Sequence, residues 1–162
     1  MESSEGYRER VRWPLWFHLS FAGFVALNLV VVVQVGEGAP PMASLVPGAV
    51  AALLAYIWWR LRWLDLRLDA TGAAFGFGGL KRVVPRERIR SARVEDFSFG
   101  KYMGWGYRIG WQGSRDRAYS LPGCPRGVRL DFDDARGRRW SVHLSSRDPD
   151  AAVAALGTST PG

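Results

Sequence analysis

The sequence has very few of the side chains that build disulfide or metal frameworks. Cysteine occurs once, at Cys124, and histidine twice, at His18 and His143, among 162 residues. One cysteine excludes an intrachain disulfide and a paired-cysteine metal site, and two histidines do not supply a zinc ligand set. We therefore expect no metal or other cofactor. A reducing compartment suits the soluble part of such a chain.

Lysine is scarce as well, because Lys81 and Lys101 are the only two and the other twenty cations are arginines. Most of the net charge of +7 falls between residues 65 and 150, where 17 Lys and Arg face 11 Asp and Glu. A basic domain suits an anionic membrane surface or nucleic acid, and we expect the membrane and no nucleic acid. The excess of arginine is also typical of GC-rich genomes, in which case the charge serves no specific partner.

Charge is nearly absent from two apolar runs near the N-terminus. Residues 15–35 contain only four polar side chains, and their length matches the roughly 20 residues that cross a hydrocarbon core. Residues 42–59 form a second run without charge, and a turn rich in glycine and proline separates the two runs. A cleaved signal peptide ending near Ala39 is the alternative for the first run. That run is longer than the apolar core of about 7–15 residues usual in signal peptides.

We therefore predict a two-helix transmembrane hairpin over residues 13–63, with spans at about 14–35 and 42–61. Arginines flank the outer ends of the two runs, whereas the turn between them has no Lys or Arg; the flanking residues are Arg8, Arg10, Arg12, Arg60, Arg62 and Arg67. The positive-inside rule then places both termini in the cytoplasm of a cell bounded by this membrane. Residues 1–12 become a cytoplasmic N-terminal tail in this interpretation.

Small residues in the second run predict where the two helices touch. Gly48 and Ala52 are four residues apart, as are Ala51 and Ala55, and such spacing lets two helix backbones approach closely. Asn28 in the first run is expected to hydrogen-bond across the pair or to a second copy of the chain. His18 lies near the cytoplasmic end of the first run, among aromatic residues. We interpret it as an interfacial side chain, with proton relay as the alternative.

After the second run the hydrophobic period changes to two. Residues 64–69 alternate strictly between apolar and charged side chains, which is typical of a half-buried strand. Further strand-like runs separated by glycine and proline are residues 91–97, 105–111, 117–121, 127–132 and 139–144. Short strands at this spacing predict an antiparallel barrel or sandwich.

A helix is predicted to close this β-rich domain. Asp148 is a suitable N-cap and Pro149 a suitable first helical residue, and Val153 and Leu156 then share one apolar face. We expect the domain to span residues 64–157 and residues 158–162 to form a disordered tail.

Several short motifs, in their order along the chain, resemble the bacterial pleckstrin-homology (PH)-like small membrane proteins of actinobacteria. They are Leu66-Arg67-Leu68 followed by Gly72, Val84-Pro85-Arg86-Glu87-Arg88-Ile89, Gly104-Trp105-Gly106-Tyr107-Arg108, Gly127-Val128 before Leu130, and Asp148-Pro149. The resemblance implies an all-β PH-like domain, a barrel or sandwich capped by one C-terminal helix. It does not imply phosphoinositide binding, because most such bacterial domains have no known ligand.

The segment from Phe97 to Trp105 is the strongest candidate for a contact surface. It combines aromatic residues, glycines and one lysine without clean alternation, and the candidate contact residues are Phe97, Phe99, Lys101, Tyr102, Trp105 and Arg108. Such a segment suits a membrane interface or a protein partner. The alternative is that it packs over the barrel mouth as part of the core. Arg108 is alternatively expected to pair with Asp96 or Glu95.

No residue pattern predicts a catalytic site. The glycines near residue 104 do not open a helix after a strand, as nucleotide-binding loops require. Asp131, Asp133 and Asp134 lack further oxygen ligands at loop spacing, and Ser141 with His143 and Asp131 shows no nucleophile elbow. We interpret these as surface strand residues.

The sequence therefore predicts a non-enzymatic, membrane-anchored binding or scaffold module that docks a protein partner or anionic lipid at the inner leaflet of the plasma membrane. The alternative is a non-catalytic accessory subunit of a larger membrane enzyme or transporter. Membrane lipids, a membrane protein or a second copy of the chain are the expected partners.

Overall fold

The computed structural model describes residues 6–36, 41–111, 113 and 115–157. The chain divides into two compact units, which are residues 13–62 (the helical unit) and residues 1–12 with 63–162 (the β unit). The expected tail at residues 158–162 and the centre of the expected turn near Glu37 lie outside the described residues.

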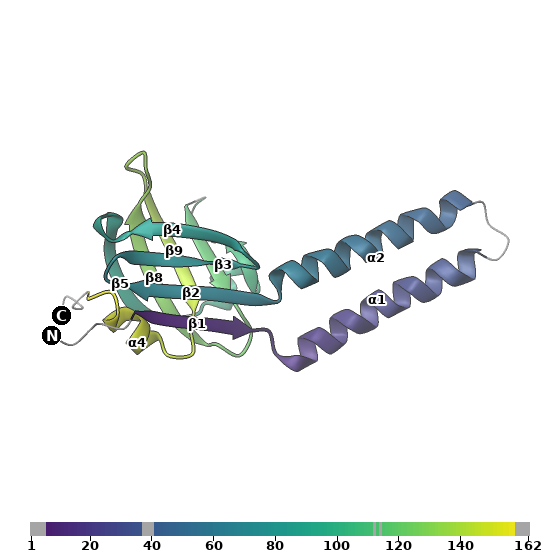
Figure 1. Ribbon diagram of the computed structural model, residues 1–162, viewed down its shortest axis with the longest axis horizontal. Coiled ribbons are helices and arrows are strands. Elements are labelled where there is room, and N and C mark those ends of the chain that lie inside the picture. The colour runs from purple at the N-terminus through teal and green to yellow at the C-terminus, as the bar shows by residue number, and fades with distance from the viewer. Residues whose placement is uncertain (1–5, 37–40, 112, 114, 158–162) are drawn as a thin grey trace. The chain divides into compact units, whose positions relative to one another are not determined.

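The helical unit consists of α1 (Leu15–Gly36) and α2 (Pro41–Leu61), which run side by side in Figure 1. In the described part of the chain, one stretch, Leu15–Gln34 in α1, is long and apolar enough to cross a membrane. A signal sequence near the N-terminus meets the same criteria. The apolar stretch described in α2, Leu45–Leu61, is shorter.

The helices meet through only part of the expected small-residue face. Ala51 is buried and Ala55 half-buried, whereas Ala52 is exposed and the space around Gly48 is open. Asn28 is half-buried, and its side-chain amide donates to the carbonyl of Phe24 one turn earlier in its own helix, at 2.8 Å. The contact line of α2 therefore runs through residues four apart, such as Ala51 and Ala55, and does not include Ala52.

Aromatic side chains join the helices at the end where α1 begins and α2 ends. Trp58 Nε1 donates to His18 Nδ1 at 2.9 Å, and Trp13 Nε1 donates to the Leu61 carbonyl at 2.8 Å. Phe21 stacks on Trp58 with ring centroids 6.1 Å apart. His18 thus has a direct partner inside the helical unit.

The β unit contains two sheets. The four-stranded sheet is an antiparallel meander of β1 (Tyr7–Arg12), β2 (Trp63–Asp69), β3 (Gly72–Phe77) and β4 (Leu80–Pro85). The five-stranded sheet has the spatial order β5 (Ile89–Asp96), β8 (Arg126–Asp133), β9 (Arg139–Ser145), β7 (Asp116–Ser120) and β6 (Gly106–Ile109). A single-turn 3₁₀ helix, η1 (Arg86–Arg88), connects the sheets. The sheets differ from the wholly antiparallel expectation because β7 and β9 pair in parallel.

One hydrophobic core lies between the two sheets (Figure 1). Strict alternation turns Leu66 and Leu68 of β2 inward, where they meet Val128 and Leu130 of β8. Each such aliphatic side chain contributes about 1.5–3 kcal/mol on full burial. The predicted C-terminal helix is confirmed as α4 (Pro149–Ala154), whose N-cap Asp148 accepts a hydrogen bond from the Ala151 backbone N–H at 3.0 Å. Val153 and Leu156 are both buried, as expected.

Residues 7–12 form a strand and not the expected tail. β1 pairs with β2 in a register that places Tyr7 opposite Leu68 and Arg12 opposite Trp63, and Val11 is 1% exposed. Glu9 fixes the strand further, because it accepts hydrogen bonds from the side chain of Ser146 and the backbone of Arg147. β1 has only two apolar residues, which are too few to predict a strand from the sequence when the pairing with β2 is not known. The helical unit is thus inserted in the chain between the paired strands of a β-hairpin.

Candidate functional site

The segment that the sequence singles out, residues 97–105, folds into a short helix and a tight turn. Helix α3 (Phe99–Tyr102) is capped by Ser98, whose hydroxyl accepts from the Lys101 backbone N–H at 3.4 Å. Met103 ends the helix in the left-handed conformation with φ of 53°. The segment consequently has an inward side and an outward side.

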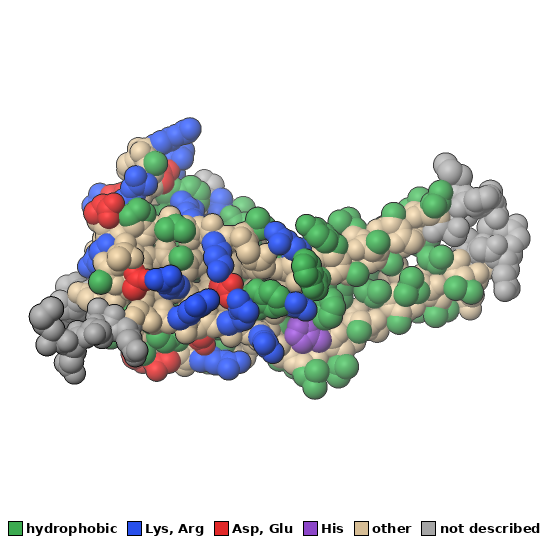
Figure 2. Space-filling model, in the orientation of Figure 1, with side chains coloured by type: hydrophobic (Ala, Val, Ile, Leu, Met, Phe, Trp, Pro, Cys, Tyr) green, Lys and Arg blue, Asp and Glu red, His purple; other side chains and the backbone are tan. Residues whose placement is uncertain are grey.

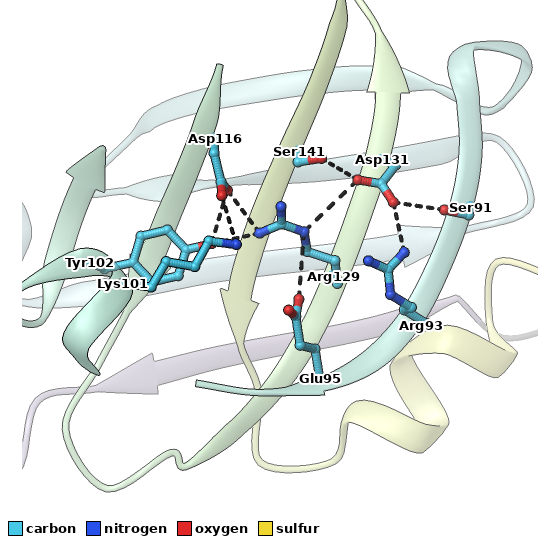
Figure 3. A network of polar contacts seen from close by, with 9 residues as sticks. All are labelled: Ser91, Arg93, Glu95, Lys101, Tyr102, Asp116, Arg129, Asp131 and Ser141. Atoms are coloured by element: carbon cyan, nitrogen blue, oxygen red, sulfur yellow. Dashed lines mark hydrogen bonds and ion pairs between the residues drawn. The ribbon is translucent and has the colours of Figure 1, made fainter. Parts of the chain in front are cut away.

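The inward side carries a buried ionic cluster (Figure 3). Arg129 of β8 donates from Nη1 to Asp116 Oδ1 at 2.8 Å and to the Tyr102 hydroxyl at 2.5 Å. Tyr102 itself donates to Asp116 Oδ1 at 2.9 Å, and Lys101 Nζ lies 2.7 Å from Asp116 Oδ2. Two strands and α3 are therefore joined through one carboxylate.

The cluster continues across the outer face of the five-stranded sheet (Figure 3). Arg129 Nε lies 3.5 Å from Glu95 Oε2 and 3.9 Å from Asp131 Oδ1. Asp131 accepts from Ser91 Oγ at 3.0 Å and Arg93 Nη1 at 2.8 Å, and it also accepts from Ser141. The expectation that Asp131 and Ser141 are simply solvated surface residues is wrong, because both are partly buried in this cluster.

The charges within the cluster stabilise one another. Burial would raise the pKa of Asp116, but hydrogen bonds from Arg129 and Lys101 outweigh it and hold that pKa below its ordinary value. Burial would lower the pKa of Arg129, and Asp116 reverses that shift. Burial raises the pKa of Tyr102, and its hydrogen bond to Asp116 acts in the same direction. The tyrosine therefore stays a neutral donor while its neighbours stay charged.

His143 lies beside this cluster and not in a catalytic triad. Its side chain is 1% exposed, and its ring centroid is 5.3 Å from that of Phe97 and 6.4 Å from that of Tyr102. Burial, with the nearby charge of Arg129, lowers the pKa of His143 to about 4. Among the described residues its Nε2 has no hydrogen-bond partner. Ser141 donates its hydrogen bond to Asp131 and not to His143, so these three residues are not arranged as a Ser-His-Asp triad.

The outward side of this segment, the adjoining strand β6 and the residue Trp111 expose large apolar side chains, which we together call the aromatic edge. Its six members are exposed by 38–75%; they are Phe99, Met103, Trp105, Tyr107, Ile109 and Trp111. Phe99 and Trp105 pack edge to face with ring centroids 5.2 Å apart. Arg108 lies among them and donates from Nε to the Trp105 carbonyl at 3.0 Å. The expected pairing of Arg108 with Asp96 or Glu95 is wrong, because Arg126 lies beside Asp96 and Arg129 beside Glu95.

The aromatic edge also follows an open strand. Within the described residues β6 pairs with β7 alone and ends the five-stranded sheet. Tyr107 of β6 contacts Tyr119 of β7, and Tyr119 stacks on Phe77 at 5.9 Å between ring centroids. Phe77 is paired with Leu64, next to Trp63. The edge therefore lies toward the end of the β unit that carries Arg12 and Trp63.

The structure divides the predicted contact residues into two groups. Phe99, Trp105 and Arg108 are exposed, whereas Phe97, Lys101 and Tyr102 point toward the sheet and hold the segment in place. Four members of the edge were not predicted: Met103, Tyr107, Ile109 and Trp111. The exposure of Tyr107 and Ile109 follows from the position of β6 at the sheet end, which a sequence without a strand order does not reveal.

Asp116 and Arg129 were missed as well. Both occupy outward positions of alternating strands, which are normally hydrated, and only the covering segment buries them. The nearby residue with a special requirement is Gly127, where a Cβ would lie 2.3 Å from the Leu144 carbonyl oxygen and 2.8 Å from His143 Nε2, so that glycine is needed beside the β9 backbone.

The described residues contain no group of three His, Cys, Asp or Glu side chains placed to hold a metal ion. The carboxylates near the β8–β9 turn are each bound by an arginine, since Asp133 lies 2.6 Å from Arg90 and Asp134 2.7 Å from Arg138.

No family model, no curated protein and no solved structure matches the chain.

Proposed function

We propose that this chain is a membrane-anchored, PH-like binding module without catalytic activity, which docks a protein partner through the aromatic edge. The observation that carries the proposal is the exposure of six large apolar side chains between Phe99 and Trp111, three of them on the segment that Tyr102 and Lys101 anchor. Monomeric soluble proteins rarely expose large contiguous apolar patches, and such patches mark interaction sites.

The pairing of β1 with β2 supports a two-helix membrane hairpin. These strands flank the helical unit and exchange hydrogen bonds, so the residues before α1 and after α2 must lie on the same side of a membrane. If α1 crosses the bilayer, α2 must cross back. With 21 residues, α2 is about 31 Å long, which suits a hydrocarbon core of about 30 Å.

The same pairing argues against a cleaved signal peptide. Cleavage near Ala39 would remove β1 from its sheet and leave the β2 edge unpaired. It would also remove Val11 from the core and Glu9 from its contacts with Ser146. The N-terminal strand is therefore better explained if the chain keeps both helices.

Cytoplasmic placement of both termini follows from the arginines that flank the helices, as the positive-inside rule requires. Labelling with a membrane-impermeant thiol reagent tests it in a Cys124→Ser background, since Cys124 is 8% exposed and uninformative. Glu37→Cys should react in intact cells and Ser4→Cys only after lysis. Labelling of Ser4→Cys in intact cells would reverse the orientation.

The PH-like assignment is supported by the antiparallel meander, the second sheet and the helix that covers the core between them. The chain departs from the expected antiparallel barrel or sandwich, because two of the nine strands in the described residues pair in parallel. The insertion of the helical unit between β1 and β2 is a further departure.

The mode of docking follows from the open edge of β6. An extended segment of a partner can add to this edge through main-chain hydrogen bonds, while the exposed aromatic side chains supply apolar contact. The buried bonds of Tyr102 and Lys101 hold the segment in advance, which reduces the entropy lost on binding.

Photo-crosslinking in native membranes tests this docking. A crosslinking amino acid is placed at Tyr107, with Arg136 in the β8–β9 turn as the control position. We expect a discrete protein adduct from Tyr107 alone, and its loss when Trp105→Ser and Ile109→Lys are combined in the same chain. Full-length protein should still accumulate in the membrane, because neither side chain belongs to the buried core, Trp105 being 38% and Ile109 54% exposed.

Adducts to lipid alone would replace protein docking with insertion into the membrane interface. Equal adducts from both positions, or adducts that survive the double substitution, would refute a specific surface. If the adduct is a subunit of a membrane enzyme or transporter, the chain is its accessory subunit.

A further inference from the structure

The outer face of the four-stranded sheet carries a groove of about 550 Å³. We call it the basic groove and define it by Arg8, Arg10, Arg67, Lys81 and Ala74. Glu9, Asp65 and Leu66 complete its lining. Figure 2 shows this face of the β unit, where Lys and Arg side chains gather with Asp or Glu side chains between some of them.

The hollow exists because β3 presents almost no side chain outward. Ala74 lies opposite Arg67 of β2, and Gly76 lies opposite Lys81 of β4. A Cβ at Gly76 would lie 1.9 Å from the Leu80 carbonyl oxygen, so only glycine fits there. The long cationic side chains of the neighbouring strands therefore enclose space above β3.

The charges on this face are not balanced. Its cations are Arg8, Arg10, Arg12, Arg67 and Lys81, and its carboxylates are Asp65 and Asp69, a surplus of three positive charges. Asp65 engages both Arg10, at 2.6 Å, and Lys81, at 3.3 Å. Arg67 lies 3.0 Å from Asp69, while Arg8 has no ion pair among the described residues.

Arg8 and Arg67 face each other directly across the β1–β2 ladder. Like charges in directly opposite positions destabilise a sheet, so this pairing does not serve the fold. An anion held between the two guanidinium groups would relieve the repulsion. Arginine is well suited to this role because its planar fork binds phosphate with two parallel hydrogen bonds.

We propose that the basic groove binds the phosphate of an anionic phospholipid headgroup. The lipid source follows from the position of the groove, because Arg10 and Asp65 are two residues from Arg12 and Trp63, about 7 Å along the strands. There the chain continues into α1 and α2. This inference rests on the membrane anchor of the proposed function and is independent of protein docking at the aromatic edge.

The test uses the full chain in mild detergent and measures bound lipid by native mass spectrometry, with phosphatidylglycerol and phosphatidylcholine as probes. The variant Arg8→Gln with Arg67→Gln removes the opposed pair. Each lost charge near a headgroup is worth about fivefold in affinity, so phosphatidylglycerol binding should fall about 30-fold. The melting temperature should stay level or rise, because a repulsive pair is removed. Phosphatidylcholine binding should not change.

The matched control is Arg88→Gln with Arg136→Gln, which removes the same charge from exposed positions outside the groove. It should keep the affinity of the original chain, as should the aromatic-edge variant Trp105→Ser with Ile109→Lys. The proposal is overturned if the groove variant binds phosphatidylglycerol as the original does, or if the control loses as much. If soluble glycerol phosphate binds as tightly as phosphatidylglycerol, the groove holds a soluble ligand and the lipid assignment is wrong.

Discussion

The outer faces of the two sheets look alike in the sequence and differ in the structure. On the four-stranded sheet the outward positions, such as Arg8 and Arg67, remain exposed around an open groove. On the five-stranded sheet Arg129 and His143 are also outward, yet they are 6% and 1% exposed because residues 97–105 cover them. A covering segment therefore turns a polar strand face into a buried ionic cluster, and its own outer side becomes apolar surface.

This contrast predicts where charge matters for stability and where it remains available for binding. An exposed ion pair is screened by water and salt and contributes little. A buried charge that loses its partner is costly, because the remaining charge has neither water nor a counterion. The covered face should therefore tolerate little change, and the open face much.

The largest effect is expected when a strand is removed from the shared core. In a helix-less variant, Asn-Gly replaces residues 13–62 and connects Arg12 to Trp63 by a two-residue hairpin turn, the loop that their pairing favours. We expect this variant to unfold cooperatively in urea. Residues 63–162 alone lack β1 and should show no cooperative transition, because domain stability of about 5–15 kcal/mol does not survive the loss of an entire strand. If the helix-less variant and residues 63–162 alone give the same urea unfolding curve, residues 7–12 are not part of the β unit.

The next effect compares one arginine from each face in the helix-less variant. Arg129→Met leaves Asp116 and Glu95 short of a counterion and should lower the free energy of unfolding by about 3–5 kcal/mol. Arg10→Met also removes a partner of an aspartate, but on the open face, and should leave the urea midpoint unchanged. If both substitutions lower the free energy of unfolding by similar amounts, the proposed difference between the covered and the open sheet face is wrong.

A pH dependence is expected from His143, the only histidine in the helix-less variant. Its folded pKa of about 4 is below the ordinary value of 6.5, so the unfolded chain binds more protons between these limits. Stability is therefore fully present above pH 6.5 and falls as the pH drops toward 4, by about 3 kcal/mol. Urea midpoints measured across this range test it. His143→Phe should flatten the curve between pH 6.5 and 5, and an unchanged slope would assign the effect to other groups.

The smallest predicted effect separates stability from docking within the covering segment. Met103 has a left-handed backbone and a side chain 63% exposed, so Met103→Gly removes strain without removing core packing. We expect the helix-less variant to gain about 1 kcal/mol of stability. The full chain should lose part of the Tyr107 crosslink, because the aromatic edge loses a member. A destabilised protein would show that Met103 packs as core.

The sequence predicted the helices and strands themselves better than which of them lie side by side in the fold. The apolar run at residues 15–35, the alternation at residues 64–69 and the Asp148-Pro149 cap each carry a local signal, and each corresponds to an observed helix or strand. β1 carries no comparable signal, since it becomes a strand only when β2 is beside it. Similarly, the sequence spacing of the small residues in α2 does not show which of them faces α1. The rotation of α2 about its axis decides this, and it buries Ala51 and exposes Ala52.

The candidate site was predictable in part. The unusual composition of residues 97–105 indicated either a contact surface or a segment packed as core, and the structure divides the segment, with Tyr102 buried and Phe99 exposed. Asp116 and Arg129 come from strands that are distant in the sequence, so their pairing depends on a strand order that periodicity does not specify. The opposition of Arg8 and Arg67 depends in the same way on register.

Hydroxyl-radical footprinting of the full chain, in native membranes and after purification in detergent, tests the central claim most directly. We expect Tyr102 to be protected in both preparations, because it is buried in the chain itself. Trp105, Tyr107 and Trp111 should be oxidised readily in the purified protein and severalfold less in native membranes, where the partner covers the aromatic edge. Equal oxidation of these three residues in both preparations would contradict a docking surface.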